Sequence, residues 1–211
     1  MKIGLTNIVF ILDKSGSMGF CKDDVIGGFN TCLKEQQELK GEALMSVVLF
    51  SDVIDDLSEI TDIKHFEPLT NETYIPCGLT ALHDAVGQTI VKLGNILNSK
   101  PETERPEKVI IIIMTDGHEN ASKEYSAETV KELVEHQKEK YNWEFIYLGA
   151  NQDAKANSRS VGVDNFTNYT VGTSKSGIKG SSTAYHTVSG CLSSFRTMGD
   201  IGDLNESIIE E

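Results

Sequence analysis

Three oxygen-bearing side chains stand at alternate positions in a short polar segment of this 211-residue chain, Asp13-Lys14-Ser15-Gly16-Ser17. Alternate residues of an extended segment point to the same side, so the Asp13 carboxylate and the hydroxyls of Ser15 and Ser17 can face one cation. Mg2+ prefers about six oxygen ligands, water often among them. The segment is therefore a candidate magnesium site, and the structural alternative is that Asp13 and Ser17 only cap the following helix.

A second carboxylate stands in an equivalent position later in the chain. Asp13 follows the apolar residues 8–12, and Asp116 follows the apolar residues 109–114 after one threonine. Continuous apolar runs of this length are typical of strands that are buried on both faces. Both aspartates are therefore expected at the carboxyl end of a central strand.

Thr80 supplies a third hydroxyl, just before an amphipathic helix predicted over residues 82–97. Loops at the carboxyl ends of parallel strands share one edge of the sheet, and ligand sites of open α/β sheets form along that edge. We expect Thr80 to meet Asp13 and Asp116 there.

Strand and helix patterns alternate along the rest of the chain. The remaining predicted helices and strands cover residues 25–39 (helix), 45–50 (strand), a helix capped by Ser126, 145–148 (strand), 154–160 (helix), 168–171 (strand) and 185–198 (helix). This order predicts an α/β fold, a three-layer α/β/α sandwich with a mostly parallel sheet. Residues 53–57 follow the strand at 45–50 so closely that they can only form a hairpin with it, which adds one antiparallel edge strand.

These side chains together resemble the metal-ion-dependent adhesion site (MIDAS) of the von Willebrand factor A domain family. The family pattern is D-x-S-x-S after the first strand, a threonine before a later helix and an aspartate after the fourth strand. The matching residues are Asp13, Ser15, Ser17, Thr80 and Asp116. The resemblance implies that the serines and the threonine bind the cation directly, and that the two aspartates bind it directly or through water.

The resemblance covers residues 7–171 in the order of elements and implies a Rossmann-like fold with one antiparallel edge strand. It also implies a binding protein rather than an enzyme: a partner protein supplies an Asp or Glu carboxylate to the metal, which is Mg2+, with Mn2+ or Ca2+ as alternatives. The chain is similar to small stand-alone bacterial and phage members. Some bacterial relatives assist ATPases of the AAA+ class or act in stress-response clusters, so such proteins are candidate partners.

Two other functions remain open at this stage. Phosphatases of the haloacid-dehalogenase type also begin with an aspartate after a buried strand, but they need a second aspartate two positions later, where this chain has Ser15. A structural scaffold that keeps the metal only for folding would lose stability without it. A binding module would instead lose its partner on metal removal while it remains folded.

Charge and composition restrict the partners and the location. The formal net charge of -13 repels phosphate backbones and anionic lipids, so we expect neither a nucleic-acid nor a membrane partner. The four cysteines have no paired spacing and no export signal is evident, which predicts reduced thiols and a cytoplasmic location. We expect one domain over residues 1–199 and an acidic, disordered tail over 200–211.

Other polar and aromatic residues near the expected edge are assigned structural roles. The acidic or imidazole side chains that could support the metal, but that we interpret as loop or helix-entry groups, are Asp52, Asp84, His118 and Glu119. Lys14 is expected to point to solvent. Three aromatic residues, Tyr74, Trp143 and Tyr147, could line a binding face, although packing is the favoured interpretation for Trp143, which stands beside a strand.

Overall fold

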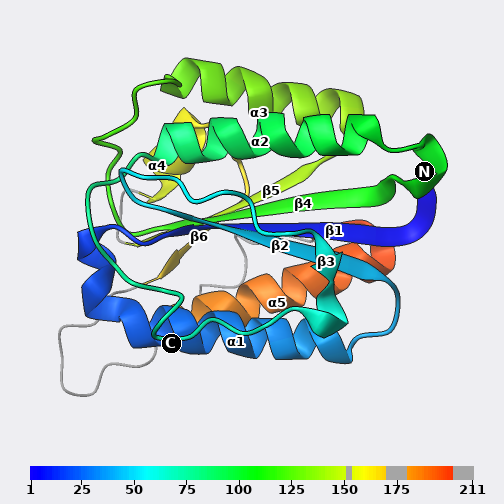
Figure 1. Cartoon of the computed structure of the whole chain (residues 1–211), viewed down its shortest axis with the longest axis horizontal. Coiled ribbons are helices and arrows are strands. Elements are labelled where there is room, and N and C mark those ends of the chain that lie inside the picture. Colours follow the sequence, from blue (N-terminus) through cyan, green and yellow to red (C-terminus); the bar gives the residue numbers. More distant parts are fainter. Residues whose placement is uncertain (151–153, 170–179, 202–211) are drawn as a thin grey trace.

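A six-stranded sheet with the order β3-β2-β1-β4-β5-β6 separates the helices into two layers (Figure 1). The structure is a computed structural model that describes residues 1–150, 154–169 and 180–201. The strands are β1 (Lys2–Asp13), β2 (Ala43–Phe50), β3 (Thr61–Asp62), β4 (Pro106–Thr115), β5 (Glu144–Ala150) and β6 (Phe166–Tyr169). The α-helices are α1 (Lys22–Glu38), α2 (Leu82–Ser99), α3 (Ala127–Tyr141), α4 (Ala154–Ser160) and α5 (Gly180–Met198). Short 3-10 helices are η1 (Gly16–Cys21), η2 (Ile63–His65) and η3 (Glu102–Glu104).

The two most apolar runs form the centre of the sheet, as predicted. Residues 7–12 of β1 pair in parallel with residues 109–114 of β4, and β1 also pairs in parallel with β2. Side chains alternate between two cores: Ile8, Phe10 and Leu12 belong to one, and Val9 and Ile11 belong to the other. Burial on both faces explains why residues 8–12 and 109–114 are all apolar.

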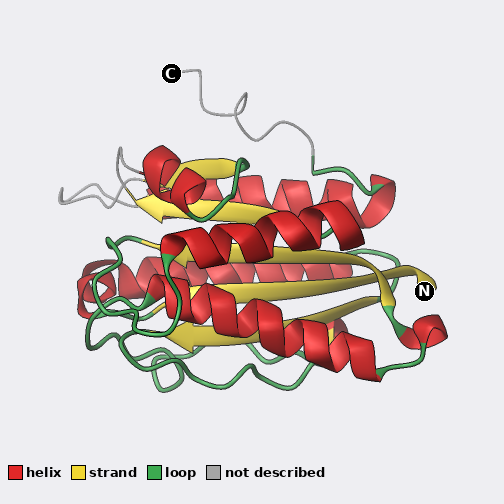
Figure 2. Cartoon of the chain, turned by 90° about the horizontal axis from the view of Figure 1, so that it is seen from above, coloured by secondary structure: helices red, strands yellow, loops and turns green. Residues whose placement is uncertain are grey.

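Each core is closed by its own pair of helices. Helices α1 and α5 cover one face and contact each other, whereas α2 and α3 cover the opposite face (Figure 1). Figure 2 is seen from the α2 and α3 side, where both helices lie over the strands. The three-layer α/β/α sandwich and its mostly parallel sheet are therefore confirmed.

The antiparallel edge strand exists, but its predicted position at residues 53–57 is wrong. Strand β3 pairs with Leu44 and Met45, at the opposite end of β2 from the expected hairpin. After β2 the chain makes an isolated bridge between Phe50 and Ile54, and the N–H groups of Asp55 and Ser58 donate to carbonyls of β2, but residues 53–57 form no strand. The pairing there stays irregular because the Val47 N–H donates to the Ser58 hydroxyl at 2.8 Å and not to a backbone carbonyl.

The later elements agree with the sequence except at their ends. Helix α4 has the predicted bounds, and the Ser126 hydroxyl caps α3 by accepting the Thr129 N–H. Strand β6 begins two residues earlier than predicted and its expected end, Val171, lies outside the described residues. Helix α5 begins five residues earlier than predicted, at Gly180 rather than residue 185.

The expected acidic tail, 200–211, lies outside the described residues from position 202 onward. The described part does reach Ile201, whose side chain is buried in the core shared with α1 and α5. In the described parts of the chain, no helix combines the length and the apolar character that crossing a membrane requires.

Contact between α1 and α5 depends on Gly28, and this generates a stability prediction. A Cβ atom added at Gly28 would lie 2.1 Å from Cδ2 of Tyr185, whereas one added at the neighbouring Gly27 would meet nothing within 4 Å. We expect Gly28→Ala to lower the free energy of unfolding by about 1–3 kcal/mol, because a buried ring must move. Gly27→Ala, the control, should raise it by about 0.5–1 kcal/mol through helix propensity. Urea denaturation measures both, and equal effects of the two substitutions would contradict this packing.

Candidate metal centre

The candidate site lies where the chain order of the sheet reverses. From β1 the chain continues to β2 on one side, whereas β4, on the other side of β1, continues to β5. Asp13 is the last residue of β1, and Asp116 follows the last residue of β4. Because the connections leave in opposite directions at this point, the ends of β1 and β4 border a crevice of the kind that holds ligands in open α/β sheets.

Asp13 is held rigidly beneath the surface by its neighbours. It is fully buried. One carboxylate oxygen accepts the Ser15 N–H at 2.6 Å, and the other accepts the Thr115 hydroxyl at 2.6 Å. The Tyr74 hydroxyl donates to the Asp13 carbonyl, and burial raises the pKa of Tyr74 well above its usual value, which keeps this donor protonated. Both the side chain and the backbone of Asp13 are therefore fixed.

Three of the other expected ligands form a chain of close oxygen contacts. The hydroxyl oxygens of Ser15 and Ser17 are 3.2 Å apart, and the Ser17 hydroxyl donates to the Asp116 carboxylate at 2.7 Å. Adjacent ligands of an octahedral Mg2+ at about 2.1 Å would be separated by about 3.0 Å. The observed spacing is thus close to that of neighbouring ligands on one hard cation.

Thr80 is joined to the same group through the loop after β4. Its N–H donates to the Asn120 side-chain oxygen at 2.9 Å, and its carbonyl accepts the N–H groups of Asn120 and Ala121. A Cβ atom at Gly117 would lie 3.0 Å from the Thr80 hydroxyl and 3.8 Å from the Ser17 hydroxyl. Thr80 and Ser17 therefore both face Gly117, so the structure brings all five expected residues together.

The two carboxylates are not compensated by a protein cation. Burial raises the pKa of Asp13 from 3.8 to about 6, against the hydrogen bonds from Thr115 and Ser15 that lower it. Burial also raises the pKa of Asp116. In the described part of the chain no ion pair involves either of them.

The nearest lysine in sequence pairs elsewhere. Lys14 was expected to point to solvent, but its ammonium lies 2.8 Å from Asp55 and its side chain is largely buried. The prediction was wrong because the chain after β2 folds back along β2 and brings Asp55 within reach of the Lys14 ammonium. The site thus keeps its negative charge although a lysine stands inside the motif.

This donor set fits a hard divalent cation. It consists of three hydroxyls and two carboxylates, with Asp13, Ser15 and Thr80 buried and with Ser17 exposed at the open side. Hard cations such as Mg2+ and Ca2+ prefer oxygen ligands of this kind. Among residues 1–150, 154–169 and 180–201 there is no cluster of three or more His, Cys, Asp or Glu that could hold a metal, so a zinc site of the soft-ligand type is not found there.

The acidic residues around the site stabilise its loops, as the sequence interpretation proposed. Asp84 accepts the N–H groups of residues 123–125 at 2.7–2.9 Å. Glu119 accepts those of His83, Ala121 and Ser122. Despite partial burial, these bonds hold the pKa of Glu119 below its usual value. Asp84 and Glu119 therefore connect the start of α2, which follows Thr80, to the loop that follows Asp116.

Asp52 and His118 are the remaining two of the four residues that could support the metal. Asp52 accepts the Leu79 N–H at 3.1 Å, a loop contact of the expected kind. His118 is exposed. The aromatic residues Tyr74, Trp143 and Tyr147 are all buried, so they contribute to packing rather than to an open binding face.

Sequence reasoning missed the residues that position Asp13. Thr115 and Tyr74 contact it through strand register and a loop, which no local pattern reveals. No role was predicted for Gly117, which directly follows Asp116. Its small size was the available signal, because a loop between two ligands leaves no room for a side chain.

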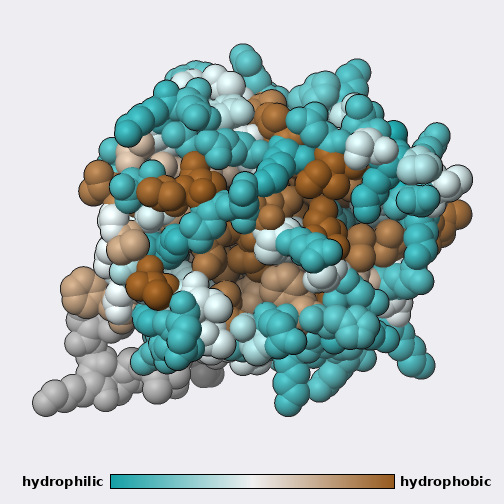
Figure 3. Space-filling model, in the orientation of Figure 1, coloured by the Kyte–Doolittle hydropathy of each residue, from teal (hydrophilic) through white to brown (hydrophobic). Residues whose placement is uncertain are grey.

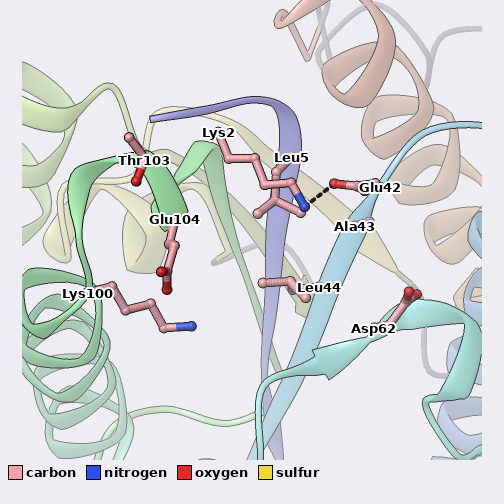
Figure 4. A pocket seen from close by; sticks show the side chains of 9 residues that line it. All are labelled: Lys2, Leu5, Glu42, Ala43, Leu44, Asp62, Lys100, Thr103 and Glu104. Carbon is pink, nitrogen blue, oxygen red and sulfur yellow. Dashed lines mark ion pairs between the residues drawn. The ribbon is translucent and has the colours of Figure 1, made fainter.

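A hollow of about 440 Å3 lies at the opposite edge of the sheet (Figure 4). Its lining includes Lys2 and Glu42, which form an ion pair, together with Lys100 and Glu104. Charges of both signs face it, and none of the five expected ligands is among its lining residues. The pocket is therefore separate from the candidate metal centre.

Comparisons with known proteins bear on the fold. No family model matches the sequence, and no curated protein matches it either. Similar solved structures include the ArnB paralog VWA2 from Sulfolobus acidocaldarius, with 19% identity, a TM-score of 0.52, and 90% of this chain and 45% of that chain covered. Another is proximal thread matrix protein 1 from the mussel byssus, with a zinc-occupied MIDAS motif, at 16% identity, a TM-score of 0.59, and 87% and 47% covered.

A third similar structure is the vWF domain of the type V pilus tip protein Mfa5 from Porphyromonas gingivalis, with 11% identity and a TM-score of 0.61. The match covers 89% of this chain and 94% of that domain. The chain spans less than half of the length of the first two proteins. Together with the sheet order, this likeness defines the class: the chain has the von Willebrand factor A fold.

The buried carboxylate of Asp13 predicts an unusual pH dependence of stability. Because its pKa is higher in the folded chain than the ordinary 3.8, the folded state binds more protons between pH 4 and about 6. The contribution of Asp13 to the stability of metal-free protein therefore falls as pH rises through this window, by at most about 3 kcal/mol, and stays low above it. In the presence of chelator, Asp13→Asn should stabilise the protein at pH 7.5 but hardly at pH 4.

Urea denaturation at both pH values measures this difference. Asp164→Asn, which removes an exposed carboxylate paired with Lys138, is the control and should not stabilise the protein at either pH. A destabilised Asp13→Asn variant at pH 7.5 without metal would show that the carboxylate is not under electrostatic strain.

Proposed function

We propose that this chain is a divalent-cation-dependent protein-binding module and not an enzyme. In this proposal Asp13, Ser15, Ser17, Thr80 and Asp116 form a MIDAS that holds Mg2+, and a partner protein completes the ligand shell with an Asp or Glu carboxylate. The observation that carries the proposal is the convergence of two uncompensated carboxylates and three hydroxyls at the sheet edge, with one open side.

The charge balance supports an external carboxylate. A bound cation supplies a positive centre that polarises and attracts anions. Hydroxyl ligands are neutral, so Ser15, Ser17 and Thr80 would leave much of this charge available to a ligand from outside. Without the cation, the negative chain would repel an acidic partner.

The similar structures also support a metal-assisted contact between proteins. One of them carries zinc in its MIDAS motif, and the others include a pilus tip protein, which is consistent with metal-assisted contacts between proteins. Mg2+ is proposed because the donor set is all oxygen, and Mn2+ or Ca2+ are the alternatives.

The proposal also favours binding over phosphatase chemistry. A phosphatase of the haloacid-dehalogenase type would need a carboxylate at position 15 as general acid. Ser15 stands there, and its hydroxyl lies 3.2 Å from that of Ser17, where it fits a metal ligand.

A cytoplasmic location is proposed on the basis of the four free cysteines, three of which are buried.

Removing single neutral ligands should weaken the metal without unfolding the protein. We expect Ser17→Ala and Thr80→Ala each to raise the dissociation constant for Mg2+ by at least about tenfold. Calorimetric titration measures this, and circular dichroism checks the fold. The control is Thr197→Ala, whose hydroxyl bonds only to carbonyls within its own helix and should leave Mg2+ binding unchanged. Absence of Mg2+, Mn2+ and Ca2+ binding in the folded wild-type chain would refute the proposed function.

Metal and partner should depend on each other by the same factor. A partner captured from native extract on the immobilised chain should be released by chelator, and Thr80→Ala should not retain it. Replacement of the partner's interface carboxylates by amides, one at a time, should identify one that the interaction requires. A partner that remains bound through both treatments would leave the cation with a structural role only, as in a scaffold.

A further inference from the structure

Four large apolar side chains are exposed on the loops around the candidate metal centre. They are Phe20, Val53, Ile75 and Leu79, which are 93%, 64%, 58% and 56% exposed, and we call them the apolar rim. Figure 3 shows apolar side chains among hydrophilic ones at the left end of the molecule, where the carboxyl ends of the central strands lie in Figure 1. Clustered exposed apolar groups are typical of interaction surfaces rather than of free solvent-facing loops.

Two of these residues lie on segments that contact each other directly. The Gly16 N–H donates to the Gly78 carbonyl at 3.1 Å, which joins η1 to the segment before α2. One turn further along η1, a Cβ atom at Gly19 would lie 4.0 Å from Cβ of Pro76. Phe20 and Ile75, the neighbours of these last two residues in sequence, therefore belong to one continuous part of the surface.

The other two residues are joined in the same way. The Leu79 N–H donates to the Asp52 carboxylate at 3.1 Å, so Leu79 and Val53 stand on adjacent loops. Leu79 directly precedes Thr80, and Phe20 follows Ser17 by three residues. The apolar rim thus borders two of the proposed ligands.

The opposite side of the site has a different character. There the loop after β4 presents His118, Glu119 and Asn120, and the last two are occupied by hydrogen bonds that organise the loops. This side offers no large exposed apolar side chain among those found in the described residues. Among the described residues, a ligand at the metal would therefore meet exposed large apolar side chains on the side of the rim only.

Ionised carboxylates stand among the rim residues. The Leu79 N–H holds the pKa of Asp52 below its usual value, and a hydrogen bond with Thr70 does the same for the pKa of Glu72. Both side chains are exposed. Lys14, the lysine within the motif, is neutralised by Asp55. Lys123 lies near Asp52 and Lys22 lies near Glu72, while Asp23 and Asp24 stand close to Phe20 in the first turn of α1. Acidic groups therefore outnumber basic ones around the rim, and a complementary segment would carry positive charge.

We propose that the partner segment recognised here contains an acidic residue for the metal, a large apolar residue within two positions of it that packs on the apolar rim, and basic residues flanking both. This inference rests on the proposed function, because the acidic residue is placed by the metal. The apolar contact adds affinity and fixes the direction in which the segment lies across the site, since the apolar rim borders the metal on one side. The flanking basic residues match the carboxylates of Asp52 and Glu72.

The probe is a library of random peptides displayed on phage, selected on the folded full chain in Mg2+ and eluted with chelator. The enriched peptides should combine an acidic residue with a large apolar residue within two positions and with lysine or arginine nearby. A synthetic peptide of the enriched sequence should bind Phe20→Ser/Leu79→Ser at least about tenfold more weakly than wild type, since burial of apolar side chains is lost. The control Ile3→Ser changes an 87% exposed residue near the start of β1 and should not affect binding.

The possible outcomes separate this inference from the proposed function. If acidic peptides are enriched in Mg2+ but apolar and basic residues are not, the metal-dependent function stands and the apolar rim is not part of the recognition surface. If no peptide is released by chelator, both are overturned. Unchanged affinity of the double variant, with its fold intact by circular dichroism and its Mg2+ affinity equal to wild type, would also overturn the role of the rim.

Discussion

The parallel pairing of β1 with β4 is the constraint on which the candidate site depends. Because residues 7–12 pair in register with residues 109–114, the two strands end side by side. Asp13 is the last residue of β1, and Asp116 directly follows β4. Thr115, the last residue of β4, can then donate its hydroxyl to Asp13. Two apolar strands that bury nearly every side chain thus deliver two carboxylates to one point at the surface.

This arrangement has an electrostatic cost that the surrounding loops do not remove. Backbone and hydroxyl donors partly compensate Asp13, yet burial still raises its pKa to about 6. Other carboxylates nearby have structural roles. Asp84 and Glu119 accept N–H groups of the loop after β4, and Asp55 forms an ion pair with Lys14. Asp13 and Asp116 also accept hydrogen bonds, but burial still raises the pKa of each, whereas the pKa of Glu119 is lowered. A site of this kind is suited to a cation that arrives from solution.

The same loops determine what could approach such a cation. Carboxylates join the loops that carry Thr80 and Asp116, so the ligands are held on a rigid frame. On one side of this frame the side chains are polar, and on the other the apolar rim is exposed. A binding surface with different character on its two sides can distinguish partners by more than their charge. The von Willebrand factor A fold supplies the position of the site, and these loops supply what is particular to this chain.

Local sequence was sufficient for the layers, the central strands and the five oxygen-bearing residues. Apolar runs at residues 8–12 and 109–114 can only be buried strands, and hydroxyl and carboxylate types identify themselves. An antiparallel edge strand was expected from a short connection after β2, but the strand that forms, β3, follows a longer one and pairs with the other end of β2. Side-chain periodicity and residue chemistry are properties of neighbouring residues, so the sequence by itself determined these features.

Tertiary structure alone decided which distant groups meet. Neither the Thr115 hydroxyl on Asp13, nor the pairing of Lys14 with Asp55, nor the placement of β3 beyond Ser58 could be read from local patterns. Each depends on strand register and on the path of a loop between segments far apart in the chain. The pKa of Asp13 has the same origin, because it reflects burial and partners that exist only once β1, β4 and their loops have assembled.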